Sequence, residues 1–430
     1  MIEQNMYESA LIDWNFWGSF RIDYIERDYD IGRLVSNRYA LVLYGVRRAG
    51  KSWLAYGYLK RMIEGGLDPR ETLIVNFEDP RLYGIKAEEC LRILREYMEL
   101  TNAKNPIIVL DEVQNVRGWE KFVRYLVENR RFRVIVTGSS SKLLSREYAT
   151  VLTGRHIDVE VYPLSFREFL RFKGLEIRDK VDALKNESRI RGLMREYVEY
   201  GGYPEVVLEE DTLVKKKLLQ QYFYDILEKD VTRRYGIKKY SILLSLANIY
   251  LQNISNKVKY RKIAKTLKQH VSLIERYSQY LETARLFSFI KKFSYKAKEV
   301  ERSLRKVYVI DVGFHYNLTL KTPKEMGRIL ENIVYLHLAR KNLKIHYYTT
   351  KAGKEIDFVI GDVKPTPVEV AYEVDEEHIR KILKALEELK SKNGTIVSWN
   401  EEDTIRKNGK TIRIIPAWKY LLNIDSKKAV

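Results

Sequence analysis

The residues best suited to chemistry lie in the segment GVRRAGKS at positions 45–52, which matches the phosphate-loop pattern G-x-x-x-x-G-K-[ST] completely. The apolar run ALVLY precedes it and a helical segment follows it, a context that disfavours a chance glycine-rich turn. In such a loop, successive backbone N–H groups surround phosphate oxygens, and the helix N-terminus adds partial positive charge. We therefore predict that ATP and Mg²⁺ bind here, through Gly45, Arg48, Ala49, Gly50, Lys51, Ser52 and Trp53.

A second apolar run, IIVLDEVQ at positions 107–114, ends in two acids. Asp111 could hold Mg²⁺ through water, and Glu112 could polarise the attacking water, while Lys51 neutralises the phosphates and Ser52 offers its hydroxyl to Mg²⁺. A strand that ends in two acids is common on its own. After a phosphate loop, however, it predicts that both segments meet at the carboxyl edge of one parallel sheet. The order Asp-Glu favours hydrolysis over simple nucleotide binding.

Three further segments could complete an ATPase site, and each has a structural alternative. Ser139 or Ser140, at the end of RVIVTGSSS, could contact the γ-phosphate or could be the N-cap of a helix. Asn76, after TLIV, could contact Glu112 or water, or could simply form a turn. Arg155, in LTGRHIDVEVYPL, could reach the γ-phosphate of a neighbouring subunit in a ring, or could be a surface residue.

The elements that must position these residues follow an α/β pattern from about residue 39 to residue 161. Short β-branched apolar runs alternate with helical stretches there, as expected for a parallel sheet covered on both faces. The pattern then turns helical, with the break GGYP, and ends in a mixed α/β segment. We predict four parts: a P-loop ATPase core (1–164), a helical lid (165–240), a winged helix-turn-helix (241–322) and a C-terminal α/β domain (323–430).

The charge of the chain predicts a polyanionic partner. The formal net charge is +19, and the stretch between Thr212 and Ile310 holds 23 Lys and Arg against 7 Asp and Glu. This local excess favours nucleic acid, whereas the alternative, a well-solvated surface on a heat-adapted protein, would spread the charge. The single cysteine, Cys90, excludes an intrachain disulfide and fits a reducing cytoplasm. We find no signal peptide and no bilayer-spanning run, so we expect a cytoplasmic protein outside the membrane.

Seven segments of the chain together resemble a known family: GVRRAGKS, VNFEDPRL, IIVLDEVQ, VIVTGSSS, LTGR, YPLSFREFL and GGYPEVV. In this order they resemble the archaeal and bacterial AAA+ ATPases that carry a C-terminal domain of unknown function. The resemblance implies an AAA+ domain, a winged helix and a domain like the PD-(D/E)XK nuclease fold, and we expect self-association as a hexameric ring. The residues carried over are Lys51 and Ser52 for phosphate and Mg²⁺, Asp111 and Glu112 for metal and hydrolysis, Ser139 for γ-phosphate sensing and Arg155 as the arginine finger.

In the winged-helix segment we predict DNA contacts, mainly to the phosphate backbone. SLIERYSQYLETARL would be the recognition helix, which presents Arg276 but few side chains that read bases well. Lys291, Lys292 and Lys296 lie on or near the predicted wing and suit phosphates. The alternative is a module that only packs against other parts of the protein.

The last domain holds three acids that resemble the PD-(D/E)XK constellation, namely Glu331, Asp357 and Glu369. In that fold, carboxylates bind Mg²⁺ and a lysine activates water. The lysine is expected two residues after Glu369, where this chain has Ala371. The preceding hairpin could replace it through Lys351 or Lys354. Because the expected ammonium is missing, we favour a degenerate nuclease fold kept for binding or assembly.

The function predicted from these features is an ATP-driven protein that binds DNA and remodels it, or translocates on it, as a ring. One alternative is a nucleotide-operated DNA-binding switch in which slow hydrolysis acts as a timer. Another is an ATP-dependent nuclease. Duplex-stimulated ATP turnover would favour the first, and metal-dependent cutting that needs Asp357 would favour the last.

Overall fold

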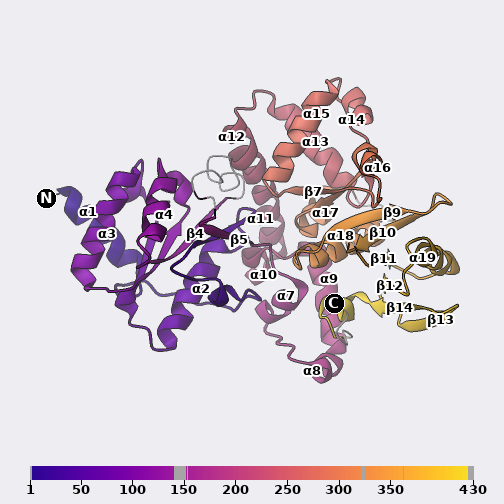
Figure 1. The fold of residues 1–430 in the computed structure, drawn as a ribbon, viewed down its shortest axis with the longest axis horizontal. Coiled ribbons are helices and arrows are strands. Elements are labelled where there is room, and N and C mark those ends of the chain that lie inside the picture. Colours follow the sequence, from indigo (N-terminus) through magenta and orange to yellow (C-terminus); the bar gives the residue numbers. More distant parts are fainter. Residues whose placement is uncertain (1, 140–151, 153, 321–324, 362, 425–430) are drawn as a thin grey trace. The chain divides into compact units, whose positions relative to one another are not determined.

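The computed structural model describes residues 2–139, 152, 154–320, 325–361 and 363–424. The chain divides into two compact units, Met1–Tyr162 and Pro163–Val430, each of which is described by itself (Figure 1). The first unit lies within the segment 1–164 that was predicted as the ATPase core. The predicted lid, winged-helix and C-terminal segments all lie in the second unit.

The first unit is built on a five-stranded parallel sheet with the strand order β2-β3-β4-β1-β5. Its strands are β1 Ala40–Gly45, β2 Thr72–Asn76, β3 Ile107–Asp111, β4 Arg133–Ser139 and β5 His156–Glu160. Residues of β1 to β4 are almost all buried, because helices cover both faces of the sheet. This confirms the parallel α/β sheet that the apolar runs predicted.

Helices lie on both faces of this sheet (Figure 1). They are α1 Ile2–Trp14, α2 Lys51–Glu64, α3 Ala87–Thr101 and α4 Trp119–Glu128, with short 3-10 turns at Ile31–Arg33, Pro69–Glu71, Pro80–Leu82 and Val113–Asn115. Side chains of α1, α3 and α4 share one core with Val42, Ile108 and Val134. Because strand side chains alternate between faces, their neighbours in sequence face the other side, where α2 packs.

The N-terminal segment closes the exposed edge of the sheet at β2. The side chain of Asn15 is fully buried, and its amide both donates to the carbonyl oxygen of Ile74 (2.9 Å) and accepts from the Ile74 N–H (2.6 Å). Trp17 donates its indole N–H to the carbonyl of Thr72 at 3.0 Å. Side chains thus satisfy backbone groups that a further strand would otherwise bond.

The second unit begins with helices. They are α7 Phe166–Phe172, α8 Lys180–Lys185, α9 Glu187–Tyr200, α10 Pro204–Leu208, α11 Thr212–Asp225, the π-helix η5 Ile226–Thr232 and α12 Arg233–Tyr235. α7 starts with a capping box, in which Ser165 and Glu168 each bond the other's backbone N–H.

Three more helices and a small antiparallel sheet follow. The helices are α13 Tyr240–Gln252, α14 Tyr260–Thr266 and α15 Val271–Thr283, and the sheet has the order β6-β8-β7, with β6 Lys257–Val258, β7 Phe287–Ile290 and β8 Arg305–Val309. No sequence pattern indicated β6, because it is only two residues long. The connection between β7 and β8 contains the helix α16 Ala297–Arg302.

The rest of the second unit holds a mixed six-stranded sheet with the order β13-β14-β12-β11-β10-β9. Its elements are α17 Val312–Leu318, α18 Glu325–Ala339, β9 Ile345–Thr349, β10 Glu355–Ile360, β11 Thr366–Ala371, α19 Glu376–Glu388, β12 Asn393–Ser398, β13 Asp403–Lys407, β14 Lys410–Pro416 and α20 Ala417–Leu421. α19 packs its apolar side against β10, β11, β12 and β14, while Tyr335 of α18 stacks on Phe358.

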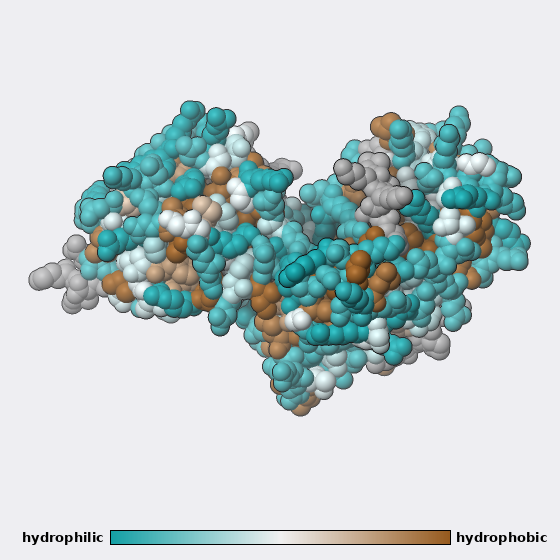
Figure 2. Space-filling model, turned by 90° about the horizontal axis from the view of Figure 1, so that it is seen from below, coloured by the Kyte–Doolittle hydropathy of each residue, from teal (hydrophilic) through white to brown (hydrophobic). Residues whose placement is uncertain are grey.

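The surfaces of both units are mainly hydrophilic on the face drawn in Figure 2, where hydrophobic residues gather in small groups. Among the described helices, none combines the length and the apolar composition needed to cross a membrane.

The break GGYP has a packing role in the second unit. The carboxylate of Asp311 accepts hydrogen bonds from the N–H groups of Gly202 (2.7 Å) and Gly313 (2.8 Å), and it caps α17. A Cβ atom on Gly201 would lie 1.6 Å from Asp311 Oδ1, so a side chain there would collide with the carboxylate. Burial raises the pKa of Asp311 to about 7, even though the two N–H donors and Arg340 act to lower it.

This raised pKa predicts a pH-dependent stability. The folded state binds the Asp311 proton more tightly than the unfolded chain does. The contribution of this proton to the free energy of unfolding is therefore complete below about pH 4 and is lost as the pH rises toward 7. Asp311→Asn removes this titration. We expect its free energy of unfolding, relative to the parent, to rise by about 2 to 3 kcal/mol between pH 5 and pH 8. Urea unfolding at both values measures this, with the exposed-strand variant Asp403→Asn as control. Parallel pH profiles for Asp311→Asn and the parent would contradict it.

Candidate functional site

The phosphate loop joins β1 to α2 in the conformation that its glycines permit. Gly45 has φ 151°, and a Cβ atom there would lie 2.1 Å from the carbonyl oxygen of Val161. Gly50 has φ 90° and is the N-cap of α2. Lys51 is buried, and its Nζ lies 3.1 Å from the carbonyl oxygen of Val46 and 3.4 Å from that of Gly45. The ammonium is therefore folded over its own loop.

Three hydroxyl groups converge on the carboxylate of Asp111 at the end of β3. Ser52 Oγ donates to it at 2.8 Å, Tyr56 donates its phenol at 2.6 Å, and Thr137 Oγ1 also bonds it. Asp111 is 4% exposed, and burial together with Glu112 raises its pKa to about 6. The sequence analysis named Asp111 and Ser52, and the structure brings them into direct contact. It missed Tyr56, one turn after Ser52 on α2, and Thr137, near the end of β4.

Glu112 follows Asp111 with a left-handed backbone, φ 53°. Its N–H donates to Thr137 Oγ1 at 3.0 Å, and the side-chain amide of Gln114 donates to its carboxylate. Thr137 thus bonds both Asp111 and the backbone of Glu112. No pattern in the sequence indicated Gln114, because a glutamine after a strand is common.

Ser139 lies beside the phosphate loop. It is buried, and it is the register partner of Gly45 where β4 pairs with β1. Its neighbour Ser140 falls outside the described residues. Asn76 accepts the N–H of Glu78 at 3.0 Å, which is the turn geometry offered as the structural alternative for this residue.

Two arginines lie at different places in the first unit. Arg155 precedes β5, at the opposite end of the strands from the phosphate loop, and pairs with Glu128 at 3.2 Å. Arg27, which the sequence analysis did not select, is 4% exposed and donates to the carbonyl oxygens of Ala49 (3.0 Å) and Tyr162 (2.9 Å). Arg27 therefore ties the phosphate loop to the chain that follows β5. Trp53, just after the loop, is half exposed.

The predicted DNA contacts lie in the second unit in two different settings. Arg276 is exposed on α15, together with the other polar residues of that helix face. On the β7–β8 connection, Lys291 pairs with Glu301 at 2.7 Å and Lys296 with Glu299 at 3.2 Å. The N–H of Lys292 bonds Ser303 Oγ at 3.2 Å.

A second group of exposed cations, which was not predicted, lies on and around α14. It consists of Lys259, Arg261, Lys262, Lys265 and Lys268, which we call the α14 basic surface. Within the described parts of the chain, none of these five side chains has an ion-pair partner.

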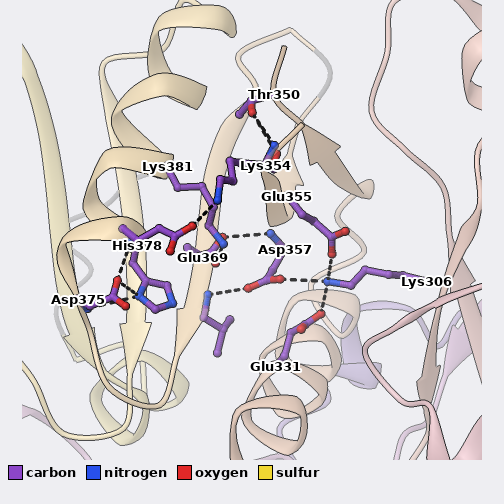
Figure 3. Close-up of polar contacts among 12 residues, drawn as sticks. Lys306, Glu331, Thr350, Lys354, Glu355, Asp357, Glu369, Asp375, His378 and Lys381 are labelled. Carbon is purple, nitrogen blue, oxygen red and sulfur yellow. Dashed lines mark hydrogen bonds and ion pairs between the residues drawn. The ribbon is translucent and has the colours of Figure 1, made fainter. Parts of the chain in front are cut away.

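Glu331, Asp357 and Glu369 of the C-terminal domain lie in one cluster, and lysines lie between them (Figure 3). Lys306 of β8 contacts Glu331 and Asp357, and Lys381 of α19 contacts Glu369. Neither lysine was selected from the sequence. Lys354 pairs instead with the exposed Glu377 at 2.6 Å. No group of three or more His, Cys, Asp or Glu residues within the described ranges has an arrangement that could hold a metal ion.

Comparisons with family models find an AAA domain that covers most of the first unit. Residues 37–170 match the family model of an AAA domain, and residues 191–325 and 326–420 match two domains of unknown function (DUF8612 and DUF4143). An uncharacterized protein of Methanocaldococcus jannaschii is 33% identical over 97% of this chain and 95% of its own length. An uncharacterized protein of Haemophilus influenzae is 32% identical over 78% and 83%. A solved DNA polymerase III gamma subunit-related protein of Thermotoga maritima is 11% identical, with TM-score 0.27, over 58% of this chain and 96% of its own.

The hydroxyl cluster at Asp111 predicts a specific loss of stability. Tyr56→Phe removes a hydrogen bond to a buried carboxylate, so we expect the free energy of unfolding to fall by about 1.5 to 3 kcal/mol. The matched control is Tyr58→Phe in the same helix, because the Tyr58 hydroxyl bonds no residue in the described part of the chain. We expect this control to change the free energy of unfolding by no more than about 0.5 kcal/mol. Equal losses in the two variants, measured by chemical denaturation, would show that the contact to Asp111 contributes nothing.

Proposed function

Because the chain belongs to the family of AAA-domain proteins that includes the two uncharacterized relatives, we propose that it binds ATP with Mg²⁺ and hydrolyses the ATP. The observation that carries this proposal is the meeting of the phosphate loop with Asp111 and Glu112 at the carboxyl edge of one parallel sheet. The groups present fit the ligand. An ammonium and backbone N–H groups suit phosphates, and a hydroxyl and a carboxylate suit Mg²⁺.

Lys51, Ser52 and Asp111 would bind the nucleotide by exchanging partners. Lys51 would leave the carbonyl oxygens of its own loop for the β- and γ-phosphates. Ser52 and Asp111 would hold Mg²⁺, which neutralises the negative charge that develops on the phosphates. Their hydrogen bond of 2.8 Å keeps the two ligand oxygens together before the nucleotide arrives.

Glu112 would polarise the attacking water. Its carboxylate is held by the Gln114 amide, which a water molecule would have to replace. Ser139, beside Gly45, would contact the γ-phosphate. Arg155 lies far along the strands from the phosphate loop of its own subunit, so we propose that it acts on the γ-phosphate of a neighbour in a ring, with a hexamer as the expected assembly.

Substitution of Glu112 tests the hydrolytic step. We expect Glu112→Gln to retain ATP but to lower the rate of phosphate release at least about 100-fold, because the carboxylate that polarises water is lost. Glu78→Gln, which changes an exposed acid after the neighbouring strand β2, is the matched control and should hydrolyse ATP at close to the parent rate. Lys51→Ala should weaken nucleotide binding itself.

The same measurement of ATP hydrolysis tests the roles proposed for Glu112 and Arg155. Hydrolysis by Glu112→Gln at the parent rate would mean that another group polarises the water. Arg155→Ala should reduce turnover only in protein that light scattering shows to be assembled, and unchanged turnover of that assembly would exclude the finger.

We also propose that the second unit binds the DNA backbone through the α14 basic surface. Cations that lack acidic neighbours keep their full attraction for phosphates, and releasing counterions from DNA favours binding. The lysines on the β7–β8 connection are less suited, since Lys291 and Lys296 already pair with glutamates. Arg276 on the adjoining helix α15 would extend the surface. Nucleotide hydrolysis in the first unit would then drive remodelling of, or translocation on, the bound DNA.

Charge-reversal substitutions test whether the α14 basic surface binds DNA. We expect the double variant Lys262→Glu with Lys265→Glu to weaken duplex binding and to lower the slope of log affinity against log salt by about 2. Lys216→Glu with Lys217→Glu makes the same change in net charge on exposed positions of α11 and should have a much smaller effect. Equal effects of the two pairs would mean that DNA responds only to net charge. Duplex that binds without raising ATP turnover would favour the nucleotide-operated switch.

A further inference from the structure

The ammonium of Lys306 lies inside the group of acids in the C-terminal part of the second unit (Figure 3). Its Nζ is 2.7 Å from Glu331 Oε1, 2.8 Å from Glu355 Oε1 and 3.0 Å from Asp357 Oδ1. The side chain of Lys306 is 2% exposed. Because an ammonium has three N–H donors, each of them can meet one of these carboxylates.

A second ammonium completes the cluster. Lys381 of α19 pairs with Glu369 on β11, and its side chain is 17% exposed. The acids are also held by neutral donors, since Asp357 accepts the N–H of Val370 at 3.0 Å and Glu331 accepts the phenol of Tyr308 at 2.6 Å. The buried carboxylates are therefore bonded on several sides within the protein.

This arrangement does not fit the Mg²⁺ that the PD-(D/E)XK resemblance implies. A divalent ion binds carboxylate oxygens, and here the oxygens that face the centre of the cluster already face Lys306. A metal would have to lie against a buried positive charge, which it would repel. Charge neutralisation that a metal would provide elsewhere is provided here by the chain's own lysine.

We propose that Lys306 is the resident cation of this carboxylate cluster, and that the cluster is a buried ion-pair latch between two sheets instead of a metal site. Lys306 is on β8 of the three-stranded sheet, Glu355 and Asp357 are on β10 of the six-stranded sheet, and Glu331 is on α18. The latch thus joins elements that are distant in the sequence.

Neighbouring contacts also connect the three-stranded sheet to the six-stranded sheet. Lys257 of β6 also pairs with Glu355. Just after β7, the N–H of Phe293 donates to the carbonyl oxygen of Tyr347 on β9 at 2.7 Å, and the Tyr347 N–H donates to the carbonyl oxygen of Lys291 at 3.2 Å. The side chains of the latch and these backbone bonds therefore connect the same two sheets.

The electrostatics of the acids agree with a closed cluster. Burial and the neighbouring Asp357 raise the pKa of Glu331 to about 8, although Lys306 acts in the opposite direction. Burial would also raise the pKa of Asp357, but Lys306 and Lys381 outweigh it and the pKa is lowered. Asp357 is thus the carboxylate that the two ammonium groups keep ionised.

The test uses the nucleotide-free full chain and Mn²⁺ as the probe, measured by calorimetric titration and by thermal unfolding. The parent should show no Mn²⁺ site that depends on Asp357. Lys306→Met should lower the unfolding temperature by roughly 5 °C or more, since it leaves buried carboxylates without their partner. Mn²⁺ should restore part of that loss, because the vacated carboxylates then bind the ion. Adding Asp357→Asn to Lys306→Met should abolish the restoration.

The matched control is Lys354→Met, which removes an ammonium paired with exposed Glu377 and should leave both readouts unchanged. If Lys306→Met does not fold, Lys306→Met with Glu331→Gln removes the ammonium together with one of the acids that contact it, and this double variant takes its place in the titration. Two results would overturn the proposal. One is Mn²⁺ binding by the parent that Asp357→Asn eliminates, and the other is an unfolding temperature for the Lys306→Met variant equal to that of the parent.

Discussion

The carboxylate of Asp111 is the point on which the candidate nucleotide site depends. It is buried at the carboxyl edge of the parallel sheet, where an isolated charge would be costly. Hydroxyl groups from Ser52 and Tyr56 of α2 and from Thr137 of β4 offset that cost. The same bonds fix the distance between the phosphate loop and β3. A single buried acid thus aligns the parts of the first unit that would handle a nucleotide.

The carboxylates of the two acidic sites are held by different kinds of donor. Asp111 is held by neutral hydroxyls, so its negative charge remains available to a cation. Asp357 and Glu369 are held by the ammonium groups of Lys306 and Lys381, so much of their charge is cancelled within the chain. Hydroxyl donors therefore suit a site that recruits a metal with its nucleotide, whereas ammonium donors suit a fixed connection between elements.

Much of the first unit could be predicted, because its signals are local. The glycines of the phosphate loop, the continuous apolar strands and the acids at the end of β3 are each read from a few adjacent residues. The partners of those acids were harder to predict from the sequence. Tyr56 and Thr137 are ordinary helix and strand residues, and Arg27 reaches the loop from a segment with no motif of its own. In the second unit, β6 was missed because two residues are too short for a pattern.

The sequence by itself determined the phosphate loop, the acid pair, the parallel sheet and the excess of positive charge, since each follows from residue type and spacing along the chain. Only the tertiary structure decided which charges meet. Lys306 and Asp357 are 51 residues apart, and they meet because two sheets lie side by side. Lysines that look alike in the sequence therefore have different surroundings in the folded protein. Lys306 is enclosed by carboxylates, and Lys262 lies exposed, because the energy of a charge depends on its neighbours in space.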